Sequence, residues 1–256
     1  MGRVFQSLGV VATLAAPAPA SAELRHLDTI AGLRAVSIAY DPLLCGFWIA
    51  SEARGLRLLA PGGREILTLE TDGIVRSLTV EHDGLLLADG WGGFTRIDRQ
   101  GTLREGTFRL ADTLRDVEGI HRDADGTLLV VEDDPARLLR IAPDGTVLQS
   151  VDGGRLDPPM TEPQGVTRDP YSGNVLVVDD NEGLNALFEL TPNGSVLSVT
   201  PLAQWGRDAE GVGLQPETGT LFVGFDGGRA LAIFAWEPSR DSIDAPLDRG
   251  PDCAFS

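Results

Sequence analysis

The chain contains no lysine, and its 21 basic residues are all arginine. Against 38 acidic residues this leaves a formal net charge of -17 at pH 7. A surface this negative repels phosphate backbones and anionic lipid headgroups, so we expect neither nucleic-acid binding nor membrane insertion. Solubility in a salty setting is one explanation of the charge. A cation-binding site is the other, and it requires carboxylates that are clustered as well as numerous.

Long apolar segments are missing once the first 22 residues are set aside, and none approaches the roughly 20 residues that a transmembrane helix needs. The first 22 residues combine Arg3, an apolar stretch over residues 4–16 and the small-residue sequence Ala20-Ser21-Ala22. This combination is typical of a secretory signal peptide with its cleavage site. The sequence therefore predicts a soluble, monomeric protein that is periplasmic or secreted.

Cysteine is scarce, because Cys45 and Cys253 are the only two. In an oxidising compartment two widely spaced thiols most simply form one disulfide, and this one would join the two ends of the mature chain. The chain also lacks a Gly-x-Ser-x-Gly motif, a Walker loop, a zinc-ligand spacing and a Rossmann fingerprint. No standard catalytic motif therefore points to an activity.

What the chain does contain is an internal repeat. Five segments align on a small residue that opens a short, mostly apolar stretch; these anchor residues are Ser37, Ser77, Gly119, Gly165 and Gly211. The anchors lie 40, 42, 46 and 46 residues apart. This is the period of a four-stranded propeller blade.

Each anchor is followed by the same series of signals. A first short strand runs into an Asp, Pro or Gly turn, and a mostly apolar second strand follows, as at 85–88 and 175–178. Tight turns such as Asp144-Gly145 then connect a third and a fourth strand. Apolar second strands are expected where neighbouring blades cover both faces of a sheet. We therefore predict an all-β propeller of four-stranded blades. A β-sandwich is the alternative, but it would not explain five copies in register.

The ends of the chain predict how the ring closes. The last repeat has three clear strands, ending near Trp236, and the N-terminal segment 23–30 resembles a fourth strand. We predict that this N-terminal strand completes the last blade and so removes two sheet edges. Five blades fit the length, and a degenerate sixth is the alternative. The predicted organisation is a signal peptide over 1–22, a propeller over 23–236 and a tail over 237–256 that packs on the first blade and brings Cys253 to Cys45.

The repeats carry a family resemblance. The pattern x-Gly-Ile/Val-x-x-Asp-x-x-x-Gly-x-Leu-x-Val-x-Asp is best seen in residues 118–132 and 164–179. It resembles the NHL and regucalcin/gluconolactonase group of propellers, and the signal peptide and small size are similar to the SdiA-regulated periplasmic propellers. The esterase-like phytase-family proteins are a more distant likeness. The resemblance implies a propeller fold, and it leaves the activity open because one propeller supports many functions.

Candidate site residues gather at one end of the predicted channel. Positions just before each anchor and positions just after each apolar second strand share that end, because antiparallel neighbours reverse direction. Carboxylates dominate both sets. The predicted residues of this end are Arg76, Glu118, Gln164, Glu210, Asp89, Glu132, Asp133, Asp179, Asp180 and Asp226. Crowded carboxylates raise one another's pKa unless a cation or an arginine lies among them.

Oxygen ligands without matching His or Cys favour Ca²⁺ or Mg²⁺ over zinc. In regucalcin-like enzymes a Glu, an Asn and an Asp on the innermost strands hold a divalent metal, and the resemblance matches them to Glu118, Gln164 and Glu210. The Asn and the Asp are therefore replaced in this chain. We predict a Ca²⁺ site, with Mg²⁺ as the alternative ion, whose ligands are Glu118, Gln164, Glu210, Asp179 and Asp180. The alternative for each acid is that it caps a turn, pairs with an arginine or faces solvent.

The remaining candidates have more general explanations beside the functional one. His121 and Glu210 are candidate acid–base groups, although a histidine on an inner strand is usually packed and hydrogen-bonded. Trp91, with Arg76, Asp89, Glu132, Asp133 and Asp226, is a candidate ligand contact, although a tryptophan in such a loop also serves to fill the gap between blades.

Three functions remain open at this point. The first is a binding propeller that takes a small molecule or a protein partner at the acidic end of the channel, with Ca²⁺ as structural or bridging ion. The second is a metal-dependent hydrolase of the lactonase or phosphoesterase type, in which the same ligands activate a bound water. The third is a protein-interaction platform that uses the blade edges, on which the sequence is silent.

Overall fold

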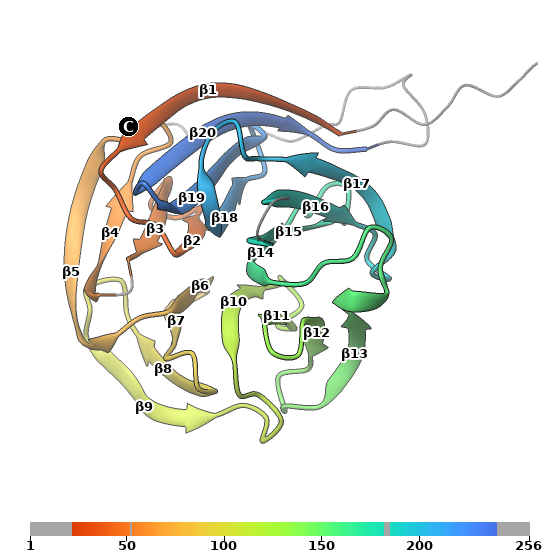
Figure 1. Ribbon diagram of the computed structural model, residues 1–256. Helices are drawn as coiled ribbons and strands as arrows, with labels where there is room; N and C mark the ends of the chain where they lie inside the picture. Colours follow the sequence, from red (N-terminus) through yellow and green to blue (C-terminus); the bar gives the residue numbers. More distant parts are fainter. Residues whose placement is uncertain (1–21, 52, 182–184, 240–256) are drawn as a thin grey trace, which may run out of the picture.

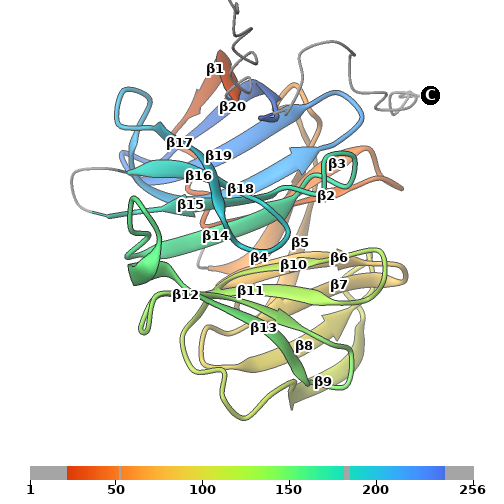
Figure 2. The ribbon, with the colours of Figure 1, turned by 90° about the vertical axis from the view of Figure 1, so that its right-hand side faces the viewer.

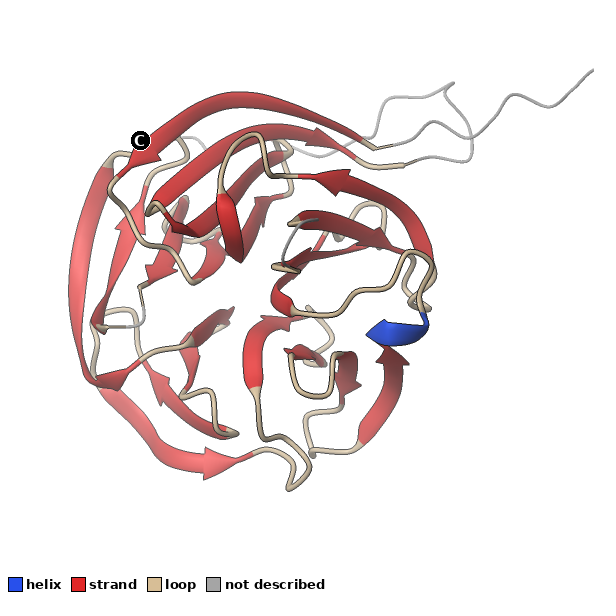
Figure 3. Ribbon diagram, viewed as in Figure 1, coloured by secondary structure: helices blue, strands red, loops and turns tan. Residues whose placement is uncertain are grey.

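The computed structural model describes residues 22–51, 53–181 and 185–239. The described chain forms twenty strands in five four-stranded antiparallel sheets, with one short 3₁₀ helix, η1 (Gly153–Arg155). Figure 1 shows the sheets arranged as blades around a central axis, and Figure 3 shows that strands and turns make up nearly all of the ring. None of the described helical structure has the length and hydrophobicity needed to cross a membrane.

Four of the blades are continuous in the chain. Blade 1 consists of β2 (Ser37–Asp41), β3 (Gly46–Ala50), β4 (Arg54–Leu59) and β5 (Glu65–Ile74). Blade 2 consists of β6 (Ser77–Glu81), β7 (Gly84–Ala88), β8 (Gly93–Ile97) and β9 (Leu103–Arg109). Blade 3 consists of β10 (Val117–Arg122), β11 (Leu128–Glu132), β12 (Arg137–Ile141) and β13 (Val147–Asp152). Blade 4 consists of β14 (Pro163–Arg168), β15 (Val175–Asp179), β16 (Ala186–Leu190) and β17 (Val196–Pro201).

Blade 5 joins the two ends of the chain. It consists of β18 (Arg207–Gln215), β19 (Thr220–Gly227), β20 (Ala230–Glu237) and β1 (Glu23–Ala31). The N-terminal strand β1 pairs antiparallel with β20, from Glu23 opposite Glu237 to Ala31 opposite Ala230. The prediction of a five-bladed ring closed by the N-terminal strand is therefore confirmed. Figure 2, turned by 90°, shows β1 and β20 side by side in this blade.

The core lies between neighbouring blades. The second strands β3, β7, β11, β15 and β19 are apolar and buried over most of their length, as their sequences predict. One core cluster joins blade 4 to blade 5, with Val178 of one packed near Val212 of the other. Between blades 5 and 1, Phe47 stacks on Phe222 with 4.0 Å between ring centroids. Each blade is therefore stabilised by apolar area that only its neighbours can cover.

The anchor residues are small because the innermost strands meet around the axis. A Cβ added to Gly165 would lie 2.5 Å from the carbonyl oxygen of Glu210, and a Cβ added to Gly211 would lie 2.8 Å from that of Ala35. A Cβ on Gly119 would collide with the carbonyl oxygen of Gln164 in the same way. A small residue therefore recurs in the repeat, because at this position one innermost strand passes close to the backbone of the next.

Where the anchor is serine, its hydroxyl connects the blades. The backbone N–H of Leu78 donates to Ser37 Oγ at 3.0 Å, and the N–H of Ile120 donates to Ser77 Oγ at 3.0 Å. Two residues further along blade 2, Thr79 Oγ1 accepts from the N–H of Arg122 at 2.9 Å. These hydrogen bonds fix the relative height of blades 1, 2 and 3 along the axis.

Some sequence predictions fall outside the described residues. Cys45 lies in the turn after β2, but Cys253 is not among the described residues, so the Cys45–Cys253 disulfide stays a prediction. The same holds for the signal peptide and for the path of the tail beyond residue 239. The last described residue of that tail, Ser239, donates its backbone N–H to Glu189 of blade 4 at 2.9 Å.

Candidate functional site

The two ends of the channel differ in chemistry. All five innermost strands run in the same direction, so their starts lie at one end of the ring and their last residues at the other. We call the end where they start the acidic end, defined by Glu118, Glu210, Asp133 and Asp180. We call the cavity at the other end, where the strands finish, the strand-end pocket.

The acidic end holds the positions that precede the anchors. Glu118 lies in β10, Gln164 in β14 and Glu210 in β18, each directly before its anchor glycine. The Gln164 and Glu210 carbonyls lie against the neighbouring anchors, so these three residues succeed one another around the axis. Arg76 occupies the same position in blade 2, and its Nη1 lies 3.6 Å from Glu118 Oε2.

Four of the predicted site carboxylates are used within the protein. Glu132 is buried, accepts from the backbone N–H of Arg115 at 2.8 Å and forms an ion pair with Arg137. Asp179 is buried and accepts from the backbone N–H groups of Thr161 at 2.7 Å and Glu162 at 3.1 Å. In both cases the carboxylate holds the loop that leads into the innermost strand.

Asp89 and Asp226 also have partners in the protein. Asp89 Oδ1 accepts from the backbone N–H of Trp91 at 2.7 Å and of Gly93 at 2.9 Å, so it closes the turn between β7 and β8. Asp226 forms two hydrogen bonds of 2.7 Å with Arg34. These contacts correspond to the structural explanation that the sequence left open for each acid.

Three carboxylates remain without such compensation. Burial raises the pKa of Asp133 to about 6, and the carboxylates of Asp116 and Glu162 raise it further. Burial raises the pKa of Asp180 to about 7, with Asp208 as the strongest of its charged neighbours. Every charged group that shifts these two pKa values is a carboxylate.

Glu210 has the largest shift of the three. Burial raises its pKa to about 8, and Asp180, Asp226 and Glu118 add to the effect, while Arg34 opposes it. The structure therefore brings Glu118, Glu210, Asp180 and Asp226 close enough to influence one another. It also brings Asp180 together with Asp133, Asp179 and Glu162.

Sequence analysis missed three members of this group, Asp116, Glu162 and Asp208. Each lies three positions before an anchor, in blades 3, 4 and 5 in turn. That shared position was a readable signal, because the same alignment that gave the anchors also aligns these acids. They concentrate negative charge on the side of the channel formed by blades 3 to 5.

The predicted metal ligands do not form a compact set. Among the described residues, no three His, Cys, Asp or Glu side chains are grouped as a metal ion would require. The Ca²⁺ site at Glu118, Gln164, Glu210, Asp179 and Asp180 therefore stays a prediction, and the oxygens present are of the type that Ca²⁺ uses.

Trp91 lies on the rim of the acidic end. Its side chain is 68% exposed, and glycines with positive φ, Gly90 at 88° and Gly92 at 81°, flank it. The backbone of Gly90 lies against the side chain of Arg76, which links this loop to Glu118. Trp91 therefore fills no gap between blades and presents an open ring face to solvent.

His121 lies at the other end of its strand. It is three residues beyond Glu118 in β10, about 10 Å at the usual rise of a strand. Its Nε2 lies 3.7 Å from Asp123 Oδ1, and burial lowers the pKa of the imidazole to about 4. His121 is therefore neutral at pH 7 and lines the strand-end pocket instead of joining the carboxylates.

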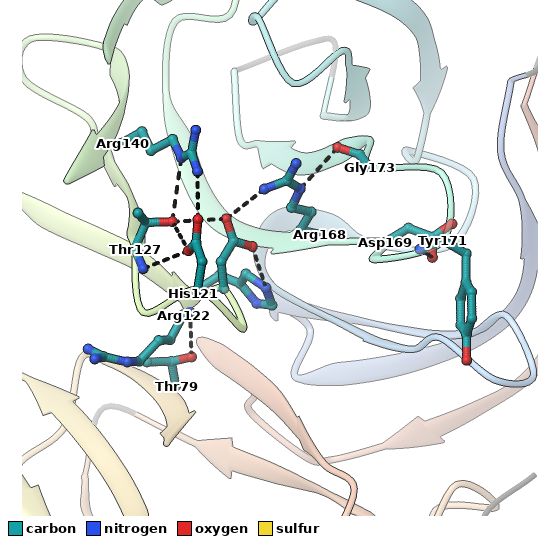
Figure 4. Close-up of polar contacts among 11 residues, drawn as sticks. Thr79, His121, Arg122, Thr127, Arg140, Arg168, Asp169, Tyr171 and Gly173 are labelled. Atoms are coloured by element: carbon teal, nitrogen blue, oxygen red, sulfur yellow. Dashed lines mark hydrogen bonds and ion pairs between the residues drawn. The ribbon is translucent and has the colours of Figure 1, made fainter. Parts of the chain in front are cut away.

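The strand-end pocket is a cavity of about 810 Å³. All five innermost strands contribute to its wall through Tyr40, Val80, His121, Thr167 and Leu214. Figure 4 shows the polar contacts on one side of it, where Arg168 is held by the carbonyl of Gly173 at 3.0 Å. The cavity was not predicted from the sequence, because the predicted site residues are carboxylates at the opposite end of the channel. The signal was again positional, since Thr79, His121 and Thr167 all lie two residues after an anchor.

Comparison with known proteins gives the fold alone. No family model and no curated protein sequence matches the chain. Among solved structures, glutaminyl cyclase from Myxococcus xanthus is similar over 88% of this chain and 100% of its own, with a TM-score of 0.65 and 14% identity. A protein of unknown function from Bacteroides caccae covers 77% of this chain and 72% of its own, with a TM-score of 0.48 and 17% identity. A chain of the Mitotic Checkpoint Complex covers 79% and 61%, with a TM-score of 0.49 and 12% identity.

Proposed function

We propose that this protein is an exported binding propeller whose acidic end takes a cationic ligand, with Ca²⁺ as the first cation to test. The observation that carries the proposal is the raised pKa of Asp133, Asp180 and Glu210, to about 6, 7 and 8. Burial and neighbouring carboxylates both raise these pKa values, and a positive charge bound among the three groups would offset both effects. The paired acids Glu132, Asp179, Asp89 and Asp226 frame this group, and they would keep its loops in place when a cation binds.

The proposal predicts that cation binding displaces protons. Asp180 and Glu210 are partly protonated at pH 7, so a bound cation lowers their pKa and releases protons to the buffer. Calorimetric titration with CaCl₂ in buffers of different ionisation enthalpy measures both the binding and the released protons. Binding should tighten as the pH rises from 6 to 9.

The matched variants separate the site from general charge. The triple variant Asp133→Asn/Asp180→Asn/Glu210→Gln should weaken Ca²⁺ binding at least tenfold. A Glu70→Gln variant removes one charge from the exposed face of the outer strand β5 and should bind as the parent protein does. A titration that gives neither heat nor a change in thermal stability with Ca²⁺ or Mg²⁺ would remove the metal ion from the proposal. Equal binding by all variants would remove the site.

A hydrolase remains a second candidate because of Glu210. A carboxyl group whose pKa is about 8 is suited to proton transfer near neutral pH. The test is turnover of a panel of lactones and phosphoesters, to which the likeness to a glutaminyl cyclase adds one peptide with an N-terminal glutamine. Turnover that Glu210→Gln abolishes and Glu70→Gln preserves would favour the enzyme over the binding protein.

A further inference from the structure

The strand-end pocket is large enough for a small-molecule ligand. Binding sites for such ligands usually enclose about 300–1,000 Å³, and this cavity holds about 810 Å³. It is built by all five blades and therefore depends on the closed ring. It lies at the opposite end of the channel from the carboxylates of the acidic end.

The arginines of the pocket wall are already paired with acids of the protein. The pairs are Arg99 with Asp41 at 2.7 Å, Arg122 with Glu81 at 3.0 Å and Arg168 with Asp123 at 2.6 Å. Asp125 in the loop after β10 pairs with Arg140 at 2.9 Å. Recruiting Arg99, Arg122 or Arg168 to a charged ligand would break an ion pair that is partly buried, which is costly. The wall therefore favours a ligand without a net charge.

The pocket wall carries neutral hydrogen-bonding groups. His121 is uncharged at pH 7, so its ring offers one donor and one acceptor. The Thr167 hydroxyl makes no hydrogen bond to another described residue, and Thr79 Oγ1 accepts from Arg122 N–H and keeps its own proton to donate. Beside these neutral groups, the wall includes the carboxylate of Glu217, whose buried Oε2 lacks a hydrogen-bond partner within the described chain and can accept from a ligand donor. Together these groups can satisfy both a donor and an acceptor on a ligand.

The pocket wall is also apolar over much of its area. Its lining includes Pro42, Val80, Pro170, Leu214 and Pro216. Leu43 stands at the rim with 69% of its surface exposed, although its loop is held by a hydrogen bond from the Leu43 N–H to Asp41. An exposed leucine beside a cavity can gain apolar contact by covering a ligand.

From this arrangement we propose that the strand-end pocket is a second binding site, which takes an uncharged amphipathic small molecule. The hydrogen-bonding head would lie against His121 and Thr167, and the apolar body against Leu214 and Leu43. The site is independent of the acidic end and of any cation bound there.

Two fluorescent probes test the preference for an uncharged ligand. N-phenyl-1-naphthylamine is neutral, carries one N–H donor and becomes fluorescent in apolar surroundings. 8-Anilino-1-naphthalenesulfonate has the same ring system with an added sulfonate. At pH 7 we expect saturable binding of the neutral probe with one site per chain, and binding of the sulfonate at least tenfold weaker. Absence of saturable neutral-probe binding, or equal affinity for the two probes, would overturn the proposal.

Matched variants locate the bound probe. Leu43→Asp should weaken the neutral probe at least fivefold, whereas Leu148→Asp, an equally drastic change at an exposed leucine of β13, should not. Thr167→Val should weaken it severalfold, and Thr200→Val on the outer strand of the same blade serves as its control. Equal affinities within either pair would overturn the assignment. The triple variant of the acidic end should keep full probe affinity, so failure of one site is distinguishable from failure of the other.

Discussion

Individual carboxylates in this protein have opposite roles that their sequence context does not reveal. Glu132 and Asp133 are neighbours, yet Glu132 is buried and paired with Arg137 while Asp133 has a raised pKa among other acids. The same holds for Asp179, which receives backbone N–H groups, and Asp180, which receives none that offsets its neighbours. The difference follows from position, because Glu132 and Asp179 are the buried last residues of β11 and β15, whereas Asp133 and Asp180 lie just beyond the strand ends.

Glu210 gives a prediction at this scale. Its pKa is raised from 4.5 to about 8, so the folded protein keeps a proton that the unfolded chain loses, and stability falls as the pH rises through that range. Glu210→Gln removes this loss. We expect the variant to match the parent near pH 4 and to gain roughly 1–3 kcal/mol in unfolding free energy at pH 9, because one pKa unit is worth about 1.4 kcal/mol and partial exposure screens the charge.

Urea unfolding at pH 4 and pH 9 measures this difference. Glu70→Gln, on the exposed outer strand, should change stability by the same small amount at both pH values. If the Glu210→Gln difference were also independent of pH, the raised pKa of Glu210 would be wrong.

On the innermost strands, the anchor residue has to be small for a steric reason. Gly165→Ala would place a methyl group 2.5 Å from the Glu210 carbonyl oxygen, a backbone atom that cannot move alone. We expect a loss of roughly 2–4 kcal/mol, which is at or above the usual cost of overpacking. Gly106→Ala on β9 is the control, since a Cβ there would meet nothing within 4 Å. Thermal unfolding of the two variants decides the matter, and equal melting temperatures would refute the steric explanation.

At this scale most of the architecture could be predicted from the sequence. The anchors, the apolar second strands and the hairpin turns repeat in register, and local signals that agree five times leave one arrangement. The partners of the buried acids could not be predicted in the same way. Glu132 accepts from Arg115, which is 17 residues earlier in the chain, and only the folded loop brings the two together.

The whole ring depends on how β1 docks. Of its side chains, Leu24 and Ile30 pack against the core, while Leu27 is 46% exposed. The double variant Leu24→Asp/Ile30→Asp should therefore destabilise the ring by roughly 2–5 kcal/mol, in line with the loss of two partly buried apolar side chains. It should also expose the edge of β20 and promote association.

Leu27→Asp is the matched control and should shift stability by less than about 0.5 kcal/mol. Melting temperature and light scattering after size-exclusion chromatography measure the two effects. A double variant that stayed as stable and as monomeric as Leu27→Asp would show that closure by β1 contributes little to the fold.

At the scale of the whole molecule the sequence predicted the ring and its closing strand but not which end of the channel holds a cavity. Side chains two positions after the anchors line the strand-end pocket, and their types, two threonines and a histidine, carry no motif. Only the closed ring shows that they face a shared space. A sequence shows where charged residues cluster, as at the acidic end, but it does not show where the folded chain encloses a cavity.

The pairing of β1 with β20 has a consequence for biosynthesis. Strand β1 has no partner in its blade until β20, some 200 residues later in the chain, has been made. Blades 1 to 4 can form in order as the chain emerges, but the fifth has to wait until β20 has been made. A truncated or stalled chain would thus carry an unpaired strand at its front, which marks it for chaperones and proteases before any of it can function.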